Sequence, residues 1–380
     1  MRILSVVTLF TPDGAYGGPT RVALNQARAL RHAGHEVLLA GAALGYPGPL
    51  PTAVDGVPVR LFPAARAIPG TGFAGMWSPA MLPWLRRALD GSDVAHIHLA
   101  RDLVTLPAAL AARRRHIPYV VQTHGMIDPS SHWLARPLDA LWTRPALTGA
   151  AAILHLTRHE ANDVVAVART NSLPLVEVLN GVPEHTPAAR SDVREVLYLA
   201  RLAPRKRPLV FVEMAQRLAP RHPGVDFTLV GPDEGEGANV RAALDRDDAG
   251  GRITWEGALS LDEAATRVDR ATVSVLPSVD EPFPMSVIEA MAAGVPVVVT
   301  DTCGLAGRIR RSGAGRVTGP STDEIAAAVD ELLSDVGLAD RAGAAGQALA
   351  QDELSITAVR RTLEDVYAAA AGVGGGRPKT

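Results

Sequence analysis

The stretch EPFPMSVIEAMAAGVPVV, residues 281–298, places two prolines ahead of a helix-forming segment and ends in a run of valines. Proline suits the approach and the first turn of a helix, so a helix is predicted to begin near Pro284 or Met285. A glycine and a proline end that helix, and PVVVT (296–300) has the unbroken apolar composition of a strand buried in a parallel sheet. The stretch therefore predicts a helix that leads into a parallel strand.

Two carboxylates flank the start of this helix, with Glu281 in the preceding loop and Glu289 inside the helix. Ligands of open α/β sheets bind at such a sheet edge, and free N–H groups at a helix start favour anions or polar oxygens. Carboxylates repel phosphate but accept hydrogen bonds from hydroxyl groups, each contributing on the order of 1.5–3 kcal/mol. The stretch suggests a ligand with diols beside a phosphate, such as a nucleotide sugar. Two solvated glutamates at a helix end are the alternative.

The composition limits the classes of protein and partner. A chain of 380 residues is long enough for two or three domains, and its net charge of −2 gives no general attraction to nucleic acid. Cys303 is the only cysteine, which excludes an intrachain disulfide and a cysteine-based zinc site and predicts a small core residue. No apolar run approaches the roughly 18 residues of a membrane span, and ILSVVTLF (3–10) is interpreted as the first strand of a cytoplasmic protein.

Apolar strand-like runs alternate with helical patterns in two successive halves of the chain. This alternation is typical of βαβ units, and it predicts an α/β fold with a parallel sheet in each half. The predicted strands of the first half are ILSVV, HEVLLAG, VPVRLF, VAHIHL, PYVVQTH and AAILHLT, and those of the second half are EVLYLARL, DFTLVG, RITWEG, TVSVLPS and PVVVT.

A stretch rich in proline and polar residues separates the two halves, and the interdomain linker is predicted around Gly181 to Ser191. Three helices are predicted from residue 322 onward. The predicted segments are a first domain over 1–184, a second domain over 185–353, a last helix at about 354–371 that crosses back to the first domain, and a flexible tail over 372–380.

Two domains of this kind occur in dehydrogenases and in glycosyltransferases, and the phosphate-binding turns distinguish these classes. A dinucleotide site requires G-x-G-x-x-G directly after a first strand, and here the turn TPDGAYGGPTR (11–21) lacks G-x-G. The sequence contains no P-loop pattern either. These observations disfavour a dehydrogenase and an ATPase of the P-loop type.

Five motifs in a fixed order decide between the remaining possibilities. They are GGPTR (17–21), QTHGM (122–126), ARLAPRKRP (200–208), LVGPDEGE (229–236) and EPFPMSVIE (281–289). With these motifs the chain resembles the family 4 retaining glycosyltransferases over about residues 1–365. The resemblance implies the GT-B architecture, in which two Rossmann-like, doubly wound parallel-sheet domains face each other across a cleft. It also implies that the nucleotide-sugar donor binds mainly to the C-terminal domain and the acceptor mainly to the N-terminal domain.

The resemblance assigns the charged motif residues to the donor. Arg201 and Lys206 follow the first strand of the second domain, where two cations suit a pyrophosphate whose negative charge grows as the glycosidic bond breaks. Ala200 stands where the family has glycine. Glu289 is implied to bind the ribose hydroxyls, and Glu281 the hydroxyls of the donor sugar. A solvated surface turn is the alternative interpretation of the RKR segment.

Backbone contacts and one histidine complete the implied site. The loop at Gly17 and Gly18 meets the diphosphate and the acceptor in the family, and His124 contacts the donor near the reacting carbon. Further donor contacts are implied for Gly231, Phe283, Pro284, Met285 and Ser286. Most family members have glycine at the two proline positions of EPFP, and proline removes an N–H donor, so sugar recognition is expected to differ there.

The resemblance also implies how the reaction runs. Substitution occurs on the same face of the sugar, the leaving phosphate oxygen accepts the proton of the acceptor, and neither a cofactor nor a protein-bound metal takes part. The implied acceptor carries a hydroxyl group and is a glycan, a lipid-linked intermediate or a small natural product. A nucleotide-sugar epimerase and a non-catalytic nucleotide-sugar-binding protein are the alternatives. The sequence leaves the sugar, the base and the oligomeric state open.

Two charged runs are interpreted as surface features. DRDD (245–248) lies at a predicted helix end and is assigned to solvated charge, not to a metal site. ARRRH (112–116) ends a predicted helix, where basic residues complement the helix dipole. A weak peripheral contact with anionic lipid at the inner face of the membrane is the alternative for this run.

Overall fold

The computed structural model describes most of the chain, and the described residues are 1–12, 17–66, 75–130, 132–182, 193–246, 250–259, 263 and 267–372. The chain divides into two compact units, Met1–Gly181 with Ile356–Thr380 and Val182–Ser355. Most of the predicted linker, residues 183–191, lies outside the described residues, as do residues 373–380 of the predicted tail and Asp247 and Asp248 of the DRDD run.

The described residues of the first unit form an eight-stranded sheet with the strand order β10-β9-β8-β7-β1-β2-β4-β3. Its strands are β1 (Arg2–Phe10), β2 (Glu36–Ala43), β3 (Ala53–Val54), β4 (Val57–Pro63), β7 (Val94–His98), β8 (Tyr119–Gln122), β9 (Ala152–His155) and β10 (Leu175–Glu177). All neighbouring strands are parallel except β3, which pairs with β4 in antiparallel orientation. The six strands predicted for the first half are confirmed. The sequence did not predict β10, the two-residue β3, or the small hairpin of β5 (Ala65–Arg66) and β6 (Met76–Trp77).

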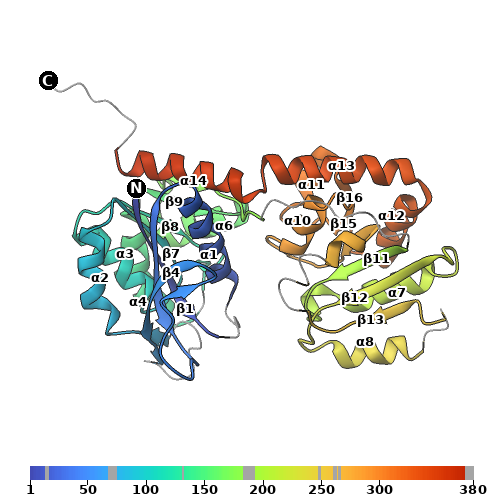
Figure 1. Cartoon of the computed structure of the whole chain (residues 1–380), viewed down its shortest axis with the longest axis horizontal. Coiled ribbons are helices and arrows are strands. Elements are labelled where there is room, and N and C mark those ends of the chain that lie inside the picture. The colour runs from blue at the N-terminus through green and yellow to red at the C-terminus, as the bar shows by residue number, and fades with distance from the viewer. Residues whose placement is uncertain are drawn as a thin grey trace. The chain divides into compact units, whose positions relative to one another are not determined.

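Helices cover both faces of this sheet. They are α1 (Gly17–His32), α2 (Met81–Asp90), α3 (Thr105–Arg114), α4 (Ala135–Leu138), the π-helix η2 (Asp139–Thr143), α5 (Arg144–Thr148), α6 (Arg158–Ala168) and α14 (Ile356–Ala370). One core cluster includes buried side chains of α2, α3, α5 and α6, and the other includes those of α1 and α14. Helix α14 lies beside α1 and buries Val359, Leu363 and Tyr367, so this last helix belongs to the core of the first unit (Figure 1).

The described residues of the second unit form a six-stranded sheet with the order β13-β12-β11-β14-β15-β16. Its strands, all parallel, are β11 (Arg194–Leu199), β12 (Val225–Val230), β13 (Ile253–Trp255), β14 (Val273–Leu276), β15 (Val297–Thr300) and β16 (Gly315–Thr318). The five predicted strands are confirmed. Strand β16 was not predicted because its sequence, GRVT, contains a glycine and an arginine and offers no apolar run.

The helical elements of the second unit include the helix that the opening stretch predicts. They are the 3₁₀-helix η3 (Pro204–Lys206), α7 (Pro208–Leu218), α8 (Gly237–Leu244), the 3₁₀-helix η4 (Val268–Arg270), α10 (Met285–Ala292), α11 (Ala306–Ser312), α12 (Thr322–Ser334) and α13 (Val336–Asp352). The predicted start of α10 near Met285 is confirmed, and Cys303 is buried as predicted. Among the helices described for the two units, none combines the length and the apolar composition needed to cross a membrane.

The strand order reverses at one point in each sheet. In the first unit this switch point lies between β1 and β7, and in the second unit it lies between β11 and β14. The loops at the carboxyl ends of these strands diverge to opposite sides of the sheet, which leaves room for a ligand. The predicted site residues follow these same strands or their neighbours.

Candidate active site

The loop between β14 and α10 carries Glu281 and is fixed by its backbone. Asp280 has a φ of 51° and donates its N–H to the hydroxyl of Thr302 at 3.0 Å. The carbonyl oxygen of Glu281 accepts a hydrogen bond from the N–H of Gly304 at 2.8 Å. Both partners lie directly after β15, so the neighbouring strand holds the loop in place. Pro284 is the N-cap residue of α10 and provides no side-chain cap.

Lys206 and Glu281 form a buried ion pair at the switch point of the second unit. Lys206 Nζ lies 2.5 Å from Glu281 Oε2, and the two side chains are 12% and 8% exposed. Arg205 lies 3.6 Å from the same oxygen and is much more exposed. A buried carboxylate requires a charged or hydrogen-bonding partner, and the loops after β11 and β14 supply it here. The sequence placed both residues in the site without predicting that they pair.

Arg201 forms an exposed ion pair with a residue of the LVGPDEGE motif. Its Nη1 lies 2.7 Å from Glu234 Oε1, and the two side chains are 54% and 40% exposed. The backbone of Arg201 accepts a hydrogen bond at 3.1 Å from the hydroxyl of Tyr198, whose pKa is raised by burial. Exposed pairs of this kind contribute roughly 0–1 kcal/mol, so an anionic ligand can replace Glu234 at little loss.

Gly231 directly follows β12, where two loops approach each other closely. Its φ is 147°, and a Cβ at this position would lie 2.0 Å from the carbonyl oxygen of Ala200. The glycine is therefore required for packing, and its donor contact stays a prediction. Just beyond it, Asp233 accepts hydrogen bonds from the N–H groups of Gly235 and Gly237 at 2.9 and 2.8 Å, which lower the pKa of this carboxyl group.

The remaining predicted residues of the second unit lie on or beside α10. Phe283 and Pro284 are buried, and Met285, Ser286 and Glu289 are half-buried. Their contacts with a donor stay predictions. Among the described residues, no group of three or more His, Cys, Asp or Glu side chains is arranged to hold a metal ion.

In the first unit, Gly17 and Gly18 open helix α1, whose preceding residues 13–16 lie outside the described part of the chain. Among the described residues, a Cβ added to Gly18 would meet no heavy atom within 4 Å. The hydroxyl of Thr20 donates to the carbonyl oxygen of Leu9 at 3.0 Å and ties the helix to β1.

His124 follows β8 in a turn that a buried carboxylate holds. The residue has a φ of 50°, which is unfavourable for a side chain with a Cβ. Glu160 is buried, and its Oε1 accepts hydrogen bonds from the Thr123 hydroxyl at 2.5 Å and from the Gly125 N–H at 2.7 Å. Sequence reasoning missed Glu160. The Thr157-x-x-Glu160 spacing, which is that of a capping box, was the available signal: at the start of α6 the Thr157 side chain accepts the N–H of Glu160, while Glu160 Oε2 accepts the N–H of Leu156.

The His124 ring lies against that of His98 from β7, and His98 in turn stacks on His96 of the same strand. His124 Nε2 lies 2.8 Å from His98 Nδ1, and the ring of His98 stacks on that of His96 with centroids 4.4 Å apart. Burial lowers the pKa of His124 and of His96 to about 3, and it lowers the pKa of His98 well below its ordinary value. All three imidazoles are therefore uncharged near neutral pH.

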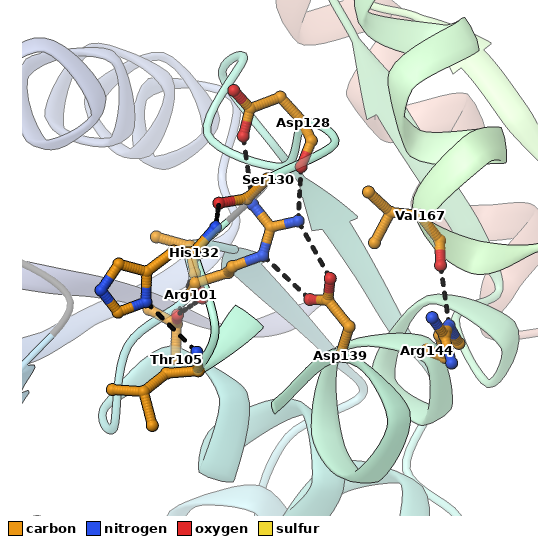
Figure 2. Close-up of polar contacts among 10 residues, drawn as sticks. Arg101, Thr105, Asp128, Ser130, His132, Asp139, Arg144 and Val167 are labelled. Atoms are coloured by element: carbon orange, nitrogen blue, oxygen red, sulfur yellow. Dashed lines mark hydrogen bonds and ion pairs between the residues drawn. The ribbon is translucent and has the colours of Figure 1, made fainter. Parts of the chain in front are cut away.

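Arg101 links the segments that follow β7 and β8 (Figure 2). Its Nε donates to Asp139 Oδ1 at 2.9 Å, and its Nη1 donates to Asp128 Oδ1 at 3.1 Å. Asp139 begins the π-helix, and Asp128 lies four residues after His124. The guanidinium thus fixes the loop beyond the histidine. The sequence offered no signal for this contact, because its partners lie 27 and 38 positions away.

The basic run at residues 112–116 ends α3, as predicted. Arg113 donates to the carbonyl oxygen of Pro145 at 2.8 Å, and Arg115 forms an ion pair with Asp90. These contacts favour the interpretation as a helix end over a lipid-binding surface. A cavity of about 450 Å³ in the second unit, lined by Arg194, Thr272 and Pro296 among others, lies at the amino ends of β11, β14 and β15. That is the sheet edge opposite to the candidate site.

Two parallel-sheet α/β units with charged and polar groups at their switch points define the GT-B class of glycosyltransferase folds, and comparisons identify the family. Residues 17–181 match the family described as "Glycosyl transferase 4-like domain", and residues 185–349 match "Glycosyl transferases group 1". The two matches together take up most of the chain. The chain belongs to the glycosyltransferases that combine a glycosyl transferase 4-like domain with a glycosyl transferases group 1 domain.

Relatives with assigned activities and solved structures agree with this assignment. The chain is 27% identical over 329 residues to alpha-D-kanosaminyltransferase of Streptomyces kanamyceticus, which covers 78% of this chain and 83% of the relative. It is 29% identical over 295 residues to 2-deoxystreptamine glucosyltransferase of the same organism, covering 70% and 76%. The Anabaena protein HepE, solved in complex with UDP-glucose, has the same fold with a TM-score of 0.68 at 17% identity, covering 97% and 100%.

Proposed function

We propose that this glycosyltransferase moves a sugar, with retention of anomeric configuration, from a nucleoside-diphosphate sugar to a hydroxyl group of its acceptor. The observation that carries the proposal is the Lys206–Glu281 pair at the switch point of the second unit. It presents a cation suited to a phosphate beside a carboxylate suited to sugar hydroxyls. HepE, solved with UDP-glucose, supports a donor of this class.

In the proposed reaction the bond between the anomeric carbon and the β-phosphate oxygen breaks while the acceptor oxygen bonds to the same face of that carbon. The acceptor's proton passes to the departing phosphate oxygen, so no side-chain base is needed. Lys206 and Arg201 stabilise the negative charge that grows on the pyrophosphate. Since these two residues supply positive charge, the proposal includes neither a metal ion nor another cofactor.

Glu281 has two roles in the proposal. It holds the Lys206 ammonium in position, and it accepts hydrogen bonds from hydroxyl groups of the donor sugar. His124 contacts the donor from the first unit, and Glu289 binds the ribose. The acceptor is a hydroxyl-bearing glycan, lipid-linked intermediate or small natural product. The two Streptomyces kanamyceticus relatives, named for kanosaminyl transfer and for 2-deoxystreptamine, favour the last of these.

Thermal unfolding with a panel of UDP-, GDP-, ADP- and dTDP-sugars tests the donor class. A ligand at 100 times its Kd adds about 2.7 kcal/mol to the free energy of unfolding. We expect one nucleotide series to stabilise the protein and Lys206→Met to reduce this effect strongly. Arg221→Gln serves as the matched control. Arg221 is an exposed cation that follows α7 and forms an ion pair with Asp330, away from the site. No shift with any nucleotide sugar would contradict the proposal.

The stereochemistry needs a separate measurement. Once a donor and an acceptor are known, the anomeric proton coupling in the NMR spectrum of the product is compared with that of the donor. The same anomer in both supports retention, and an inverted anomer would refute it. Conversion of the donor in the absence of any acceptor would identify an epimerase instead.

A further inference from the structure

One histidine beside the candidate site has no role in the proposed reaction. His98 is the last residue of β7 and is 1% exposed. Its ring lies parallel to that of His124, with centroids 5.0 Å apart and planes 10° apart. Its Nδ1 lies 2.8 Å from His124 Nε2, which makes this the contact that orients the His124 ring.

The hydrogen bond between the two rings has two possible directions. Both imidazoles are uncharged near neutral pH, so each carries one N–H group and one nitrogen lone pair. Either His98 donates from Nδ1, which leaves His124 with its hydrogen on Nδ1, or His124 donates from Nε2. In the second arrangement His98 must carry its own hydrogen on Nε2.

The surroundings of His98 Nε2 distinguish these arrangements. Within the described residues this nitrogen is buried and has no hydrogen-bond partner. The second arrangement would bury an N–H group without an acceptor, which is rare in native proteins and costs roughly 1–3 kcal/mol. The first arrangement leaves only a lone pair there, and unpaired acceptors are better tolerated than unpaired donors.

We propose that His98 is a positioning residue that holds His124 in the tautomer with its hydrogen on Nδ1. Nε2 of His124 faces His98, so Nδ1 is the ring nitrogen that remains for a ligand. His124 then offers the donor sugar an N–H group for an oxygen atom and offers no lone pair. It cannot accept the acceptor's proton, which leaves that step to the departing phosphate oxygen. The inference rests on the proposed function, in which His124 contacts the donor.

Contacts of the two residues that flank His124 keep the ring in this arrangement. Glu160 accepts hydrogen bonds from the residues on either side, through the Thr123 hydroxyl and the Gly125 N–H. The turn is thereby fixed at its left-handed φ, and the side chain leaves the backbone in one direction. His98 then determines which nitrogen of the fixed ring carries the hydrogen.

A direct test uses protein with ¹⁵N-labelled histidine and long-range ¹H–¹⁵N correlation spectra between pH 6 and 8, with His124→Gln to assign the signals. We expect His124 to show a protonated Nδ1 and an unprotonated Nε2. We expect His98→Leu to lose this single tautomer and His98→Asn, whose amide takes the place of Nδ1–H, to keep it. A protonated Nε2 on His124 in the unsubstituted protein would overturn the proposal. This measurement needs no substrate, so it decides the tautomer even if the proposed function fails.

Kinetics provide the second test. We expect His98→Leu to lower kcat by roughly tenfold or more with little change in the KM for the nucleotide sugar, and His98→Asn to restore most of the activity. His96→Leu is the matched control, because His96 is 2% exposed, stacks on His98 and has its hydrogen bond to Tyr367 instead. Equal losses in kcat for His98→Leu and His96→Leu would assign both histidines to packing and would refute the positioning role.

Discussion

Acidification from pH 7.5 to pH 5.0 should destabilise the first unit through its stacked histidines. An unfolded histidine takes up a proton near pH 6.5, whereas burial lowers the pKa of His96 to about 3. The folded state therefore binds fewer protons than the unfolded state between these pH values. The contribution of the neutral His96 to the free energy of unfolding is fully present above pH 6.5 and is lost as the pH decreases toward 3.

The size of the effect follows from the linkage relation. At pH 5.0 the unfolded state gains RT ln(1 + 10^1.5), about 2 kcal/mol, from protonating one such histidine. The value depends little on the folded pKa of His96, because pH 5.0 lies well above it. His124, whose pKa burial lowers to about 3 as well, acts in the same direction, and so does His98.

The perturbation that isolates one histidine is His96→Leu. We expect the loss of unfolding free energy between pH 7.5 and pH 5.0 to be about 2 kcal/mol smaller in this variant than in the unsubstituted protein. Urea denaturation followed by tryptophan fluorescence measures both values. The signal reports mainly on the first unit, because four of the five tryptophans, at positions 77, 84, 133 and 142, belong to it.

The substitution also changes packing, and this changes the unfolding free energy by the same amount at both pH values. The difference between the two values within each protein therefore does not contain it. His159→Leu is the control, because its side chain is 89% exposed on α6 and its replacement removes no buried imidazole. We expect this variant to lose as much stability on acidification as the unsubstituted protein. If His96→Leu also loses the full amount, His96 is not held neutral by the fold, and the reasoning is refuted.

Three other changes have defined outcomes. Lys206→Met should lower the free energy of unfolding by about 3–5 kcal/mol in urea denaturation, because it removes the closest partner of the buried Glu281 and leaves only the more distant and more exposed Arg205, and adding Glu281→Gln should recover part of this loss; full stability in the single variant would contradict the pairing. Glu160→Gln should lower stability by roughly 1–3 kcal/mol and reduce kcat, since an amide NH₂ would face at least one of the three N–H or O–H donors; unchanged thermal unfolding and kcat would show that the turn does not need the carboxylate. Gly231→Ala should destabilise the second unit by at least about 1–3 kcal/mol, because its Cβ would lie 2.0 Å from a carbonyl oxygen, and thermal unfolding like that of the unsubstituted protein would refute the close approach.

The strands and the helix start were predictable because their signals are local. VAHIHL is apolar enough to indicate a buried strand, and the prolines before Met285 mark where α10 begins. The proximity of Lys206 and Glu281 could have been predicted, because both residues follow strands that are neighbours in a Rossmann-like sheet. Their side-chain contact could not, because it depends on the conformations of the two loops. Propensities say nothing about such conformations.

Contacts across long sequence separations were not predictable. Arg101 contacts Asp139 because β7 and β8 are neighbouring parallel strands, so the segments that follow them start from the same edge of the sheet. His98 appeared in the sequence as one more strand residue. Its proposed role depends on a hydrogen bond with a ring 26 positions away, in a turn with an unusual φ that no residue type in THG dictates.

The two cations of the second unit differ in a way that bears on the proposed reaction. Lys206 is buried with Glu281, so exchanging this carboxylate for a phosphate would leave a buried negative charge without its closest partner. Arg201 and Glu234 are about half exposed, and their pair contributes roughly 0–1 kcal/mol. In the proposed reaction, therefore, Lys206 keeps Glu281 and meets the pyrophosphate with its remaining hydrogens, while Arg201 leaves Glu234 for the phosphate. Salt should then weaken donor binding mainly through Arg201, because an exposed charge is screened far more than a buried one.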